Sequence, residues 1–536
     1  MERLSLLPYH SREKRRVQAK ELTNRKKNAK ISVLTGGDHG RKNDGLKGPA
    51  AFSHGSNRII GASQRAVLEE GIMQGRAAKK KQDSLRIIIV GCGKVGHTLT
   101  EHLVREGHDI TIVDTNERVI RNTTEVYDVM GIRGNGASLS VLYEAGIELA
   151  DMIIAVTGSD ELNLLCCTIA KKAGGDISAI ARVRNPDYAE ELVYLRQQLG
   201  LSMIINPELE AARQIAHILS RPQALTVSSF AKGHAELLSF KIPSGSILAG
   251  RSIMQLDGIF QFGYLVCAVE REGSVSIPGG AYVLREGDDI TILTDTRDGH
   301  RVFEALGMES HAVGSCMIIG GGKSSYYLAR QLLAQRMDVK IIEQNRARCE
   351  ELSALLPDAT VICGDGGDEE LLREEGLESV EAFVPLTGLD EENILLTLYA
   401  KRMPGLKTIT KINRITFKDV IDGLDLGSVV YPKYVTSETI TAYVRAKQNT
   451  IGSNVETLYH LFDSKAEALE FHVDKDAPVV GVPLMKLKKK DNLLIACIGR
   501  GGKVIFPRGQ DAIQAGDTVI VVTTHSGFGD ISDILA

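Results

Sequence analysis

The sequence predicts an α/β protein with two doubly wound parallel-sheet domains, each followed by a small α+β lobe. The first observation is length, because 536 residues exceed what one hydrophobic core can organise. The second is a repeated apolar strand, glycine-rich turn and helix, RIIIVGCGKVGHTLTEHL at Arg86–Leu103 and SCMIIGGGKSSYYLARQL at Ser315–Leu332. The third is that later features recur at one spacing, such as Gly287 and Gly516, which lie 229 residues apart. The chain is therefore a duplicated two-part unit.

The front part of each unit alternates apolar, β-branched strands with helical patterns. This alternation predicts βαβ crossovers and a parallel sheet, because parallel neighbours need a helical connection. In the first unit we expect strands at Arg86–Val90, Asp109–Val113, Met130–Arg133, Met152–Val156, Ile177–Arg182 and Ser202–Ile204. Six strands with helices between them make a complete Rossmann-like domain.

The back part of each unit changes its period. Short alternating strands separated by turn residues are typical of a small α+β lobe. We expect them at Leu237–Ile242, Tyr264–Arg271 and Asp289–Thr294, and again at Glu470–Val473, Leu493–Arg500 and Thr518–Thr524. Segments Pro207–Ser220 and Val435–Gln448 are predicted helical connectors between the front and back parts.

These elements set the expected domain boundaries. We predict Rossmann-like domains at 85–205 and 313–431, with helical connectors and C-terminal lobes at 206–309 and 432–536. Residues 1–84 form a separate extension with 19 Lys+Arg against 8 Asp+Glu, whereas the remainder carries 45 against 60. Its Gly, Ser, Asn and basic residues show no sustained periodicity, which predicts disorder. A basic arm can touch anionic lipid or nucleic acid, but a solvated tail is the simpler interpretation, and we expect no nucleic-acid partner.

The overall composition, 43% apolar and 25% charged, is ordinary for a globular protein. No apolar run approaches the roughly 20 residues of a membrane-spanning helix, so we expect any membrane role to be peripheral. The eight cysteines show no CxxC pair and no metal-ligand spacing. Without a secretory signal in view, we predict a reduced cytosolic chain with no metal site.

The first glycine turn is a complete GxGxxG, with glycines at Gly91, Gly93 and Gly96. The first makes the tight turn, the second lets the backbone approach a pyrophosphate, and the third lets the helix pack on the strand. The helix then presents its N-terminal amides to the phosphates. Asp114 ends the next strand, where a carboxylate accepts hydrogen bonds from ribose hydroxyls and repels a 2′-phosphate. This context predicts an NAD(H) site.

The second turn departs from that pattern. Its third glycine is replaced by Ser325, whose side chain should push the helix slightly off the strand. Glu343 still supplies the ribose carboxylate. We therefore predict a weaker or altered nucleotide site rather than none, and the alternative is a domain kept only for symmetry.

Further candidates lie at the carboxyl ends of strands, where doubly wound folds bind ligands. Thr157 and Gly158 follow the fourth strand, and Arg182 ends the fifth, where it could reach a phosphate or a neighbouring subunit. Acidic pairs then open the next helices, at Asp160-Glu161 and Asp390-Glu391. Favourable interaction with the helix dipole explains these acids without a ligand role.

We find no catalytic constellation beside the nucleotide folds. The sequence shows no Tyr-xxx-Lys pair, His–Asp pair or HExxH, and no substrate domain large enough to enclose a hydride acceptor. We therefore predict no catalytic residues and no enzyme activity. Two dinucleotide folds without catalytic groups indicate sensing.

The chain resembles the TrkA family of bacterial and archaeal Trk potassium uptake systems, which carries tandem RCK (KTN) domains. The likeness rests on IIIVGCGKVG, IVD, GNGAS, AVTGSDELN and ARVRNPDY, and on IIGGGKSSYYLARQL and PLTGLDEEN in the second half. It covers about residues 85–536. By resemblance, the first nucleotide contacts fall on Gly91, Cys92, Gly93, Lys94, Val95, Asp114, Thr157, Gly158 and Arg182. The second set comprises Gly320, Gly321, Gly322, Lys323, Ser324, Glu343 and Lys411.

The family implies a cytoplasmic regulatory subunit, peripheral on the inner face of the cell membrane. It implies a homotetrameric ring beneath a membrane-embedded potassium transporter subunit of the TrkH or TrkG type. Family members also bind ATP or ADP, and a ribose carboxylate does not distinguish adenosine nucleotides. A ligand can bias such a ring only if it prefers one of its conformations.

Two other functions remain open from the sequence. An NAD-dependent oxidoreductase would explain the glycine turns, but the missing catalytic groups and the duplication of both parts argue against it. An RCK-type regulator of another cation channel or antiporter would share the fold. Two tandem units without a membrane segment favour the Trk system.

Overall fold

The computed structural model describes residues 84–188, 191–308, 313–413, 420–421, 423–448, 454–462 and 464–536. All of them belong to one compact region of the chain, Met73–Ala536, which contains both repeated units. The extension predicted to be disordered lies outside the described residues, Ser84 apart. Within the described residues, none of the helices combines the length and apolar character needed to cross a bilayer.

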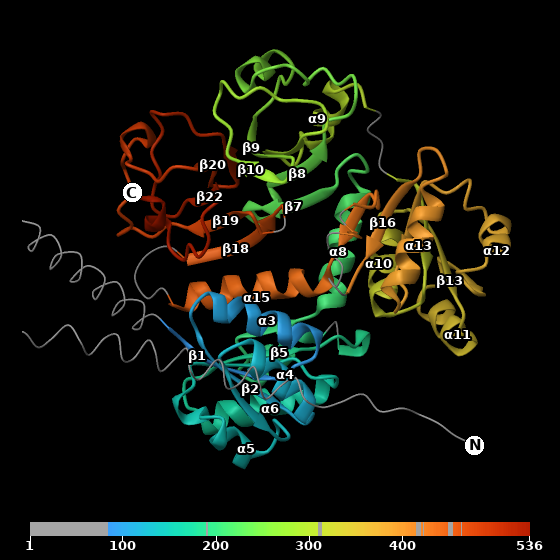
Figure 1. Cartoon of the computed structure of the whole chain (residues 1–536), viewed down its shortest axis with the longest axis vertical. Helices are drawn as coiled ribbons and strands as arrows, with labels where there is room; N and C mark the ends of the chain where they lie inside the picture. The colour runs from blue at the N-terminus through green and yellow to red at the C-terminus, as the bar shows by residue number, and fades with distance from the viewer. Residues whose placement is uncertain are drawn as a thin grey trace, which may run out of the picture. The chain divides into compact units, whose positions relative to one another are not determined.

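The first front part is a six-stranded parallel sheet in the order β3-β2-β1-β4-β5-β6 (Figure 1, blue to teal). The strands are β1 (Arg86–Val90), β2 (Asp109–Asp114), β3 (Met130–Arg133), β4 (Met152–Ala155), β5 (Ser178–Arg182) and β6 (Met203–Ile205). The helices are α3 (Lys94–Arg105), α4 (Glu117–Val126), α5 (Leu139–Glu144), η1 (Ile147–Leu149), α6 (Asp160–Ala173), η2 (Pro186–Tyr188) and α7 (Leu192–Gln198). All six predicted strands are present, which confirms the Rossmann-like fold.

Alternate residues of each strand pack on opposite faces of this sheet. Ile88 and Val90 join Cys166 and Ala170 of α6 in one buried cluster. Ile87 and Ile89 join Leu99 of α3 in another. Helices therefore cover both faces, and the carboxyl ends of the strands stay open to form a site.

The second front part repeats this topology in the order β14-β13-β12-β15-β16-β17. Its strands are β12 (Ser315–Ile319), β13 (Asp338–Glu343), β14 (Thr360–Cys363), β15 (Ala382–Pro385), β16 (Lys407–Lys411) and β17 (Ser428–Val430). Its helices are α10 (Lys323–Ala334), α11 (Arg346–Leu355), α12 (Glu369–Glu374) and α13 (Asp390–Ala400). The duplicated α/β fold class is confirmed.

Each back part is a five-stranded antiparallel sheet, ordered β10-β9-β11-β8-β7 and β18-β19-β22-β20-β21. The first contains β7 (Thr226–Phe230), η3 (Ala231–Gly233), β8 (Ala235–Lys241), η4 (Ile253–Gly258), β9 (Tyr264–Arg271), β10 (Ser274–Ser276), β11 (Asp289–Asp295) and α9 (Gly299–Ala305). The second contains β18 (Asn454–Leu461), β19 (Ala466–His472), η5 (Leu484–Lys486), β20 (Leu493–Arg500), β21 (Lys503–Ile505), β22 (Thr518–Thr523) and η6 (Ile531–Ile534). The expectation of three strands in each lobe was incomplete, since both lobes add an edge strand on either side.

One buried ion pair recurs in both lobes. Arg271 donates from Nε to the buried Asp288 at 2.7 Å, and Arg500 donates in the same way to Asp517 at 2.7 Å. Each aspartate also accepts a backbone N–H three residues before it. The matching GD turns are therefore structural, and they confirm the internal repeat.

The helical connectors are α8 (Pro207–Leu219) and α15 (Pro432–Gln448). Helix α15 begins at Pro432, earlier than the predicted Val435. Proline fits the first turn of a helix because the amide hydrogen that it lacks would have no partner within the helix there. Ile440 and Val444 of α15 are fully buried in the cluster that contains Leu99. The second connector thus packs against the first front part.

Candidate functional site

A cavity of about 590 Å³ lies at the carboxyl ends of the first sheet. Eight of the residues predicted to bind nucleotide line it: Gly91, Gly93, Lys94, Val95, Asp114, Thr157, Gly158 and Arg182. The cavity has the size that proteins use for small ligands and cofactors. Cys92 and Gly96 lie behind its wall, and Cys92 is buried.

The three glycines of the first turn face different constraints. Gly91 has φ +92°, and a Cβ there would lie 2.9 Å from the Thr157 backbone. A Cβ on Gly96 would lie 2.0 Å from the Gly91 carbonyl oxygen, so helix α3 can approach the turn only with glycine. By contrast, no heavy atom of the described residues lies within 4 Å of the position that a Gly93 Cβ would take. This open position fits the close approach of a pyrophosphate.

Asp114 is held in place by backbone amides. Its two carboxylate oxygens accept N–H bonds from Cys92 and Asn116, each at 2.8 Å. The carboxylate therefore joins the glycine turn to the loop after β2, and its remaining lone pairs lie beside the cavity. This arrangement fits the recognition of ribose hydroxyls, and it gives Asp114 a second role that the sequence did not indicate.

We predict that Asp114→Ala weakens NADH binding to the full chain by about 1.5–3 kcal/mol, as expected for lost hydrogen bonds to a charged group. Isothermal titration of wild type and variant measures the change. Glu343→Ala, at the matching position of the second unit, is the control and should leave binding at the first cavity intact. Equal NADH affinity in Asp114→Ala and wild type would contradict the assignment.

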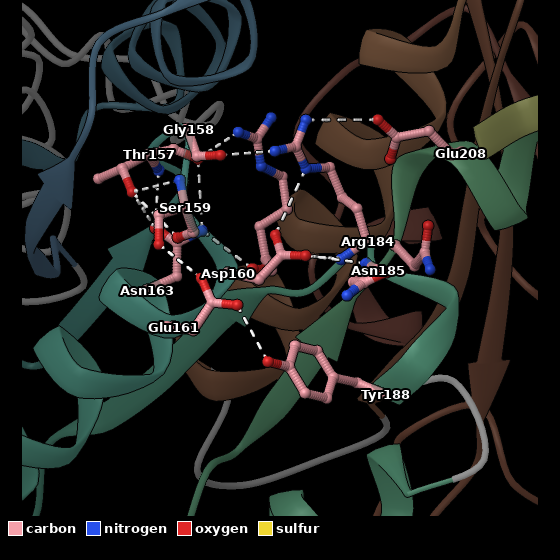
Figure 2. A network of polar contacts seen from close by, with 12 residues as sticks. Thr157, Gly158, Ser159, Asp160, Glu161, Asn163, Arg184, Asn185, Tyr188 and Glu208 are labelled. Carbon is pink, nitrogen blue, oxygen red and sulfur yellow. Dashed lines mark hydrogen bonds and ion pairs between the residues drawn. The ribbon is translucent and has the colours of Figure 1, made fainter. Parts of the chain in front are cut away.

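The loop after β4 is organised by Asn163. Its Oδ1 accepts from the backbone N–H and the hydroxyl of Thr157, both at 2.7 Å, while its Nδ2 donates to the Arg182 carbonyl at 2.9 Å. The Arg182 guanidinium in turn donates to the Thr157 carbonyl. Figure 2 shows Asn163 beside Thr157, with dashed lines for the bonds between them. The side chain of Asn163 thus ties the ends of two strands together at the cavity edge.

The acids that open α6 have structural partners. The buried Asp160 accepts the backbone N–H groups of Arg184 and Asn185 at 2.9 and 2.8 Å. Glu161 accepts from the Tyr188 hydroxyl at 3.0 Å, as Figure 2 shows. These contacts give both acids partners within the protein, in addition to the helix dipole. They fasten the segment after β5 to the start of α6.

Sequence reasoning missed several lining residues. Thr115, Gly134, Asn135 and Gly136 come from the first unit, and a Cβ on Gly136 would lie 2.2 Å from Val90. The GNG triplet was a signal for these positions. The other group comes from the connectors and the second unit: Pro207, Glu208, Asn413, Pro432 and Lys433. Their approach depends on the packing of the two units, which no local pattern encodes.

The second unit carries a related site. A cavity of about 350 Å³ is lined by Gly320, Gly321, Gly322, Glu343, Thr387 and Gly388, among others. Glu343 accepts from the Gly321 and Asn345 amides at 2.6 and 2.7 Å, as Asp114 does in the first unit. A Cβ on Gly321 would lie 3.0 Å from Glu343. A Cβ there would lie closer still to Leu352, at 2.6 Å, so glycine at this position, where the first unit has Cys92, makes room for both Leu352 and Glu343.

Ser325 is accommodated inside the second turn. It is fully buried, and its hydroxyl donates to the Gly320 carbonyl. In the first unit a Cβ at the matching Gly96 would collide with the Gly91 carbonyl oxygen, at 2.0 Å. The serine therefore holds the turn by a hydrogen bond where the first unit relies on close packing. Whether this change weakens nucleotide binding stays a prediction.

Lys411 replaces Arg182 in the second unit. It is buried, and its Nζ donates to the Leu386 carbonyl at 2.7 Å. With Lys323 and Ser324 it lines a further cavity of about 300 Å³, which Arg184 and Glu208 of the first unit close from the other side. Burial lowers the pKa of Lys411 to about 8, and the nearby Asp390 opposes this shift.

We predict that a nucleotide whose phosphates enter the cavity of about 300 Å³ binds more weakly as the pH rises through about 8, because Lys411 in its lining then loses its charge. Lys411→Arg should remove this dependence, since arginine stays protonated. Titrations of NADH between about pH 7 and 9, on chains that also carry Gly93→Ala, measure both effects. A pH-dependent Arg variant would contradict the prediction. The pKa of Lys411 is 10.5 in the unfolded chain and about 8 in the folded chain, so the unfolded chain binds the proton more tightly. Lys411 therefore lowers the free energy of unfolding most below about pH 8, and this destabilisation disappears as the pH rises toward 10.5.

Comparisons with known proteins cover nearly all of the described chain. Residues 87–207 and 316–432 match the TrkA-N domain family, and residues 237–307 and 468–536 match the TrkA-C domain family. The chain is 31% identical over 454 residues to "Trk system potassium uptake protein TrkA homolog 1" of Methanosarcina mazei, which covers 83% of this chain and 99% of that protein. It is also 31% identical to the Trk system potassium uptake protein TrkA of Vibrio alginolyticus, over 84% of this chain and 98% of that protein.

Solved structures share the fold. The GsuK channel superposes with a TM-score of 0.56 at 19% identity, over 84% of this chain and 77% of that chain. The GsuK channel bound to NAD gives a TM-score of 0.55 at 18% identity, over 82% and 77%. These two likenesses support the arrangement of two front and two back parts.

Proposed function

Because this chain belongs to the TrkA family, with TrkA-N and TrkA-C domains in tandem, we propose that it gates a Trk-type potassium uptake transporter in response to bound nucleotide. Its relatives are named as potassium uptake proteins, and the chain is a regulatory protein with RCK domains rather than an enzyme. The potassium transporter and the gating step are the proposal.

The proposed ligand of the first cavity is NAD or NADH. The single observation that carries this proposal is the open Gly93 position beside a carboxylate, Asp114, that backbone amides hold at the cavity. Lys94 and Arg182 line the same cavity and supply positive charge for phosphates. Bound NAD(H) would present a pyrophosphate and two riboses to these groups. ATP and ADP share the ribose and phosphates, so they are alternative ligands, above all for the second site.

The contacts suggest how binding could reach the rest of the molecule. Pro432 and Lys433 line the first cavity and begin α15, which packs on the first sheet and leads into the second lobe. A ligand that prefers one placement of this helix would bias the conformation of the whole chain. The other connector is linked as well, because Asn206 donates to the Tyr327 hydroxyl of α10 at 3.1 Å.

The remaining parts of the proposal concern assembly. We propose a homotetrameric ring at the inner face of the cell membrane, bound to a membrane-embedded subunit of the TrkH or TrkG type. The family names support a membrane partner because they refer to potassium uptake. The ring multiplies equivalent sites, and couplings of about 1–3 kcal/mol per site then suffice for a nearly complete switch.

Potassium flux tests the proposal. The full chain is added to proteoliposomes that hold the membrane subunit co-purifying with it, and rubidium uptake is measured with and without NADH. We expect uptake to depend on the chain and to change with NADH in wild type but not in Gly93→Ala. Rubidium uptake that is the same with and without the chain, and with and without NADH, would contradict the proposal. Co-purification of a channel or antiporter instead would assign the regulator to that protein.

A further inference from the structure

Two thiols lie beside the ribose carboxylate of the second site. Cys349, on α11, is buried, and its Sγ donates to the Glu343 carbonyl at 3.1 Å. Cys363 ends β14, where the parallel register pairs it directly with Glu343. Its Sγ lies 4.0 Å from the Gln344 carbonyl. The two thiols lie close enough for Cys363 to contribute to the raised pKa of Cys349. Two cysteines separated by fourteen positions thus meet at the residue proposed to bind ribose.

This pair distinguishes the second unit from the first. Helix α4 has Ile120 where α11 has Cys349, and β3 ends at Arg133 where β14 ends at Cys363. All eight cysteines lie within the described residues, and Cys363 is the exposed one while the other seven are buried. Oxidants reach an exposed thiol first and convert it to a sulfenic acid. A neighbouring cysteine can then react with the sulfenic acid to form a disulfide.

We propose that Cys363 and Cys349 form a reversible disulfide that weakens nucleotide binding at the second site. The oxidant is a hydroperoxide. The Cys363 thiolate attacks the terminal oxygen of the hydroperoxide. The O–O bond breaks, Cys363 becomes a sulfenic acid, and hydroxide or alkoxide is released. The released anion takes up a proton and leaves as water or alcohol. The Cys349 sulfur then attacks the sulfenic sulfur, forms the S–S bond and expels hydroxide, which takes up the thiol proton to leave as water. Both cysteines are oxidised, and the peroxide is reduced.

Burial raises the pKa of Cys349 to about 11, so this thiol stays protonated and is not the one that attacks the peroxide first. Transient disulfides of this kind occur in reducing compartments as redox sensors. A thiol reductant restores the pair. The nucleotide part of the inference rests on the proposed function.

The disulfide acts on the site through Glu343 and Gln344. Oxidation removes the thiol hydrogen that Cys349 gives to the Glu343 carbonyl, and a covalent link would fasten α11 to the end of β14 across Gln344. Glu343, Gln344 and Gly321 all line the second cavity. Since Glu343 also holds the Gly321 amide, a shift of this segment changes the turn and the carboxylate together.

The test uses the full chain carrying Gly93→Ala, so that NADH and ADP report on the second site. The protein is treated with hydrogen peroxide, and peptide mass mapping should find Cys349 linked to Cys363 with the loss of two hydrogens. Titration should show at least about fivefold weaker binding of NADH or ADP after oxidation, the lower range of allosteric couplings. Dithiothreitol should restore it.

Cys363→Ser and Cys349→Ser are the matched controls, and both should bind the probes as the reduced protein does before and after peroxide. Absence of the linked peptide would overturn the disulfide. A linked peptide with unchanged affinity would overturn its effect on the site. If the reduced protein binds neither probe, the nucleotide assignment of the second cavity fails, while the mass map still decides the disulfide.

Discussion

Replacing Arg445 with alanine is expected to lower the free energy of unfolding by about 3–5 kcal/mol, because it leaves the buried carboxylate of Glu467 without its cation. Arg445 lies on α15 with 3% of its side chain exposed. Its guanidinium donates to Glu106, after α3, at 2.5 Å and to the buried Glu467 of β19 at 3.0 Å. One side chain therefore joins the first front part, the second connector and the second lobe.

Urea unfolding followed by circular dichroism measures the loss. Arg105→Ala is the matched control, since Arg105 pairs with Glu101 on α3 but leaves 71% of its side chain exposed. An exposed pair of this kind contributes about 0.2–1 kcal/mol. A loss for Arg445→Ala as small as that of the control would show that the buried network does not hold the parts together.

Gly93→Ala is expected to reduce NADH affinity about 5- to 150-fold, which corresponds to the 1–3 kcal/mol typical of an inserted methyl group in a tight contact. Gly93 lines the first cavity, and a Cβ there meets no heavy atom of the described residues within 4 Å. The folded protein thus accommodates the methyl group, and only a ligand that approaches the backbone would meet it. The unfolding transition should remain that of wild type.

Gly322→Ala is the internal control for this prediction. Gly322 occupies the same position in the second turn and is equally open among the described residues. We expect the variant to keep the tighter NADH binding. A larger loss in Gly322→Ala than in Gly93→Ala would make the second cavity the principal NADH site and reverse the predicted order.

Much of the fold was predictable because the duplication supplied each pattern twice. The apolar strands before Gly91 and Gly320 and the six strands of the first sheet all follow from local periodicity. The edge strand β10 was missed for a physical reason. It spans only Ser274–Ser276, too few residues for an alternating pattern to identify a strand, and it forms by pairing with β9.

The parts of the candidate site that come from one local sequence motif were predictable. The parts formed by contact between segments distant in the sequence were not. Local sequence sufficed for the glycine turn and Asp114. It did not show that Asn163 fastens the loop after β4, or that Lys433 reaches the first cavity from the second connector. Compensating changes were also hidden, since the exchange of Cys92 for Gly321 is explained only by Leu352 and Glu343, which a Cβ at that position would meet.

Calorimetric titration of the full chain with NADH tests the central claim most directly, because every regulatory step depends on nucleotide occupying the first cavity. We predict saturable binding to wild type that is strongly weakened in both Gly93→Ala and Asp114→Ala, while Gly322→Ala and Glu343→Ala retain it. Absence of saturable NADH binding to wild type, or undiminished binding in both first-site variants, would contradict the account.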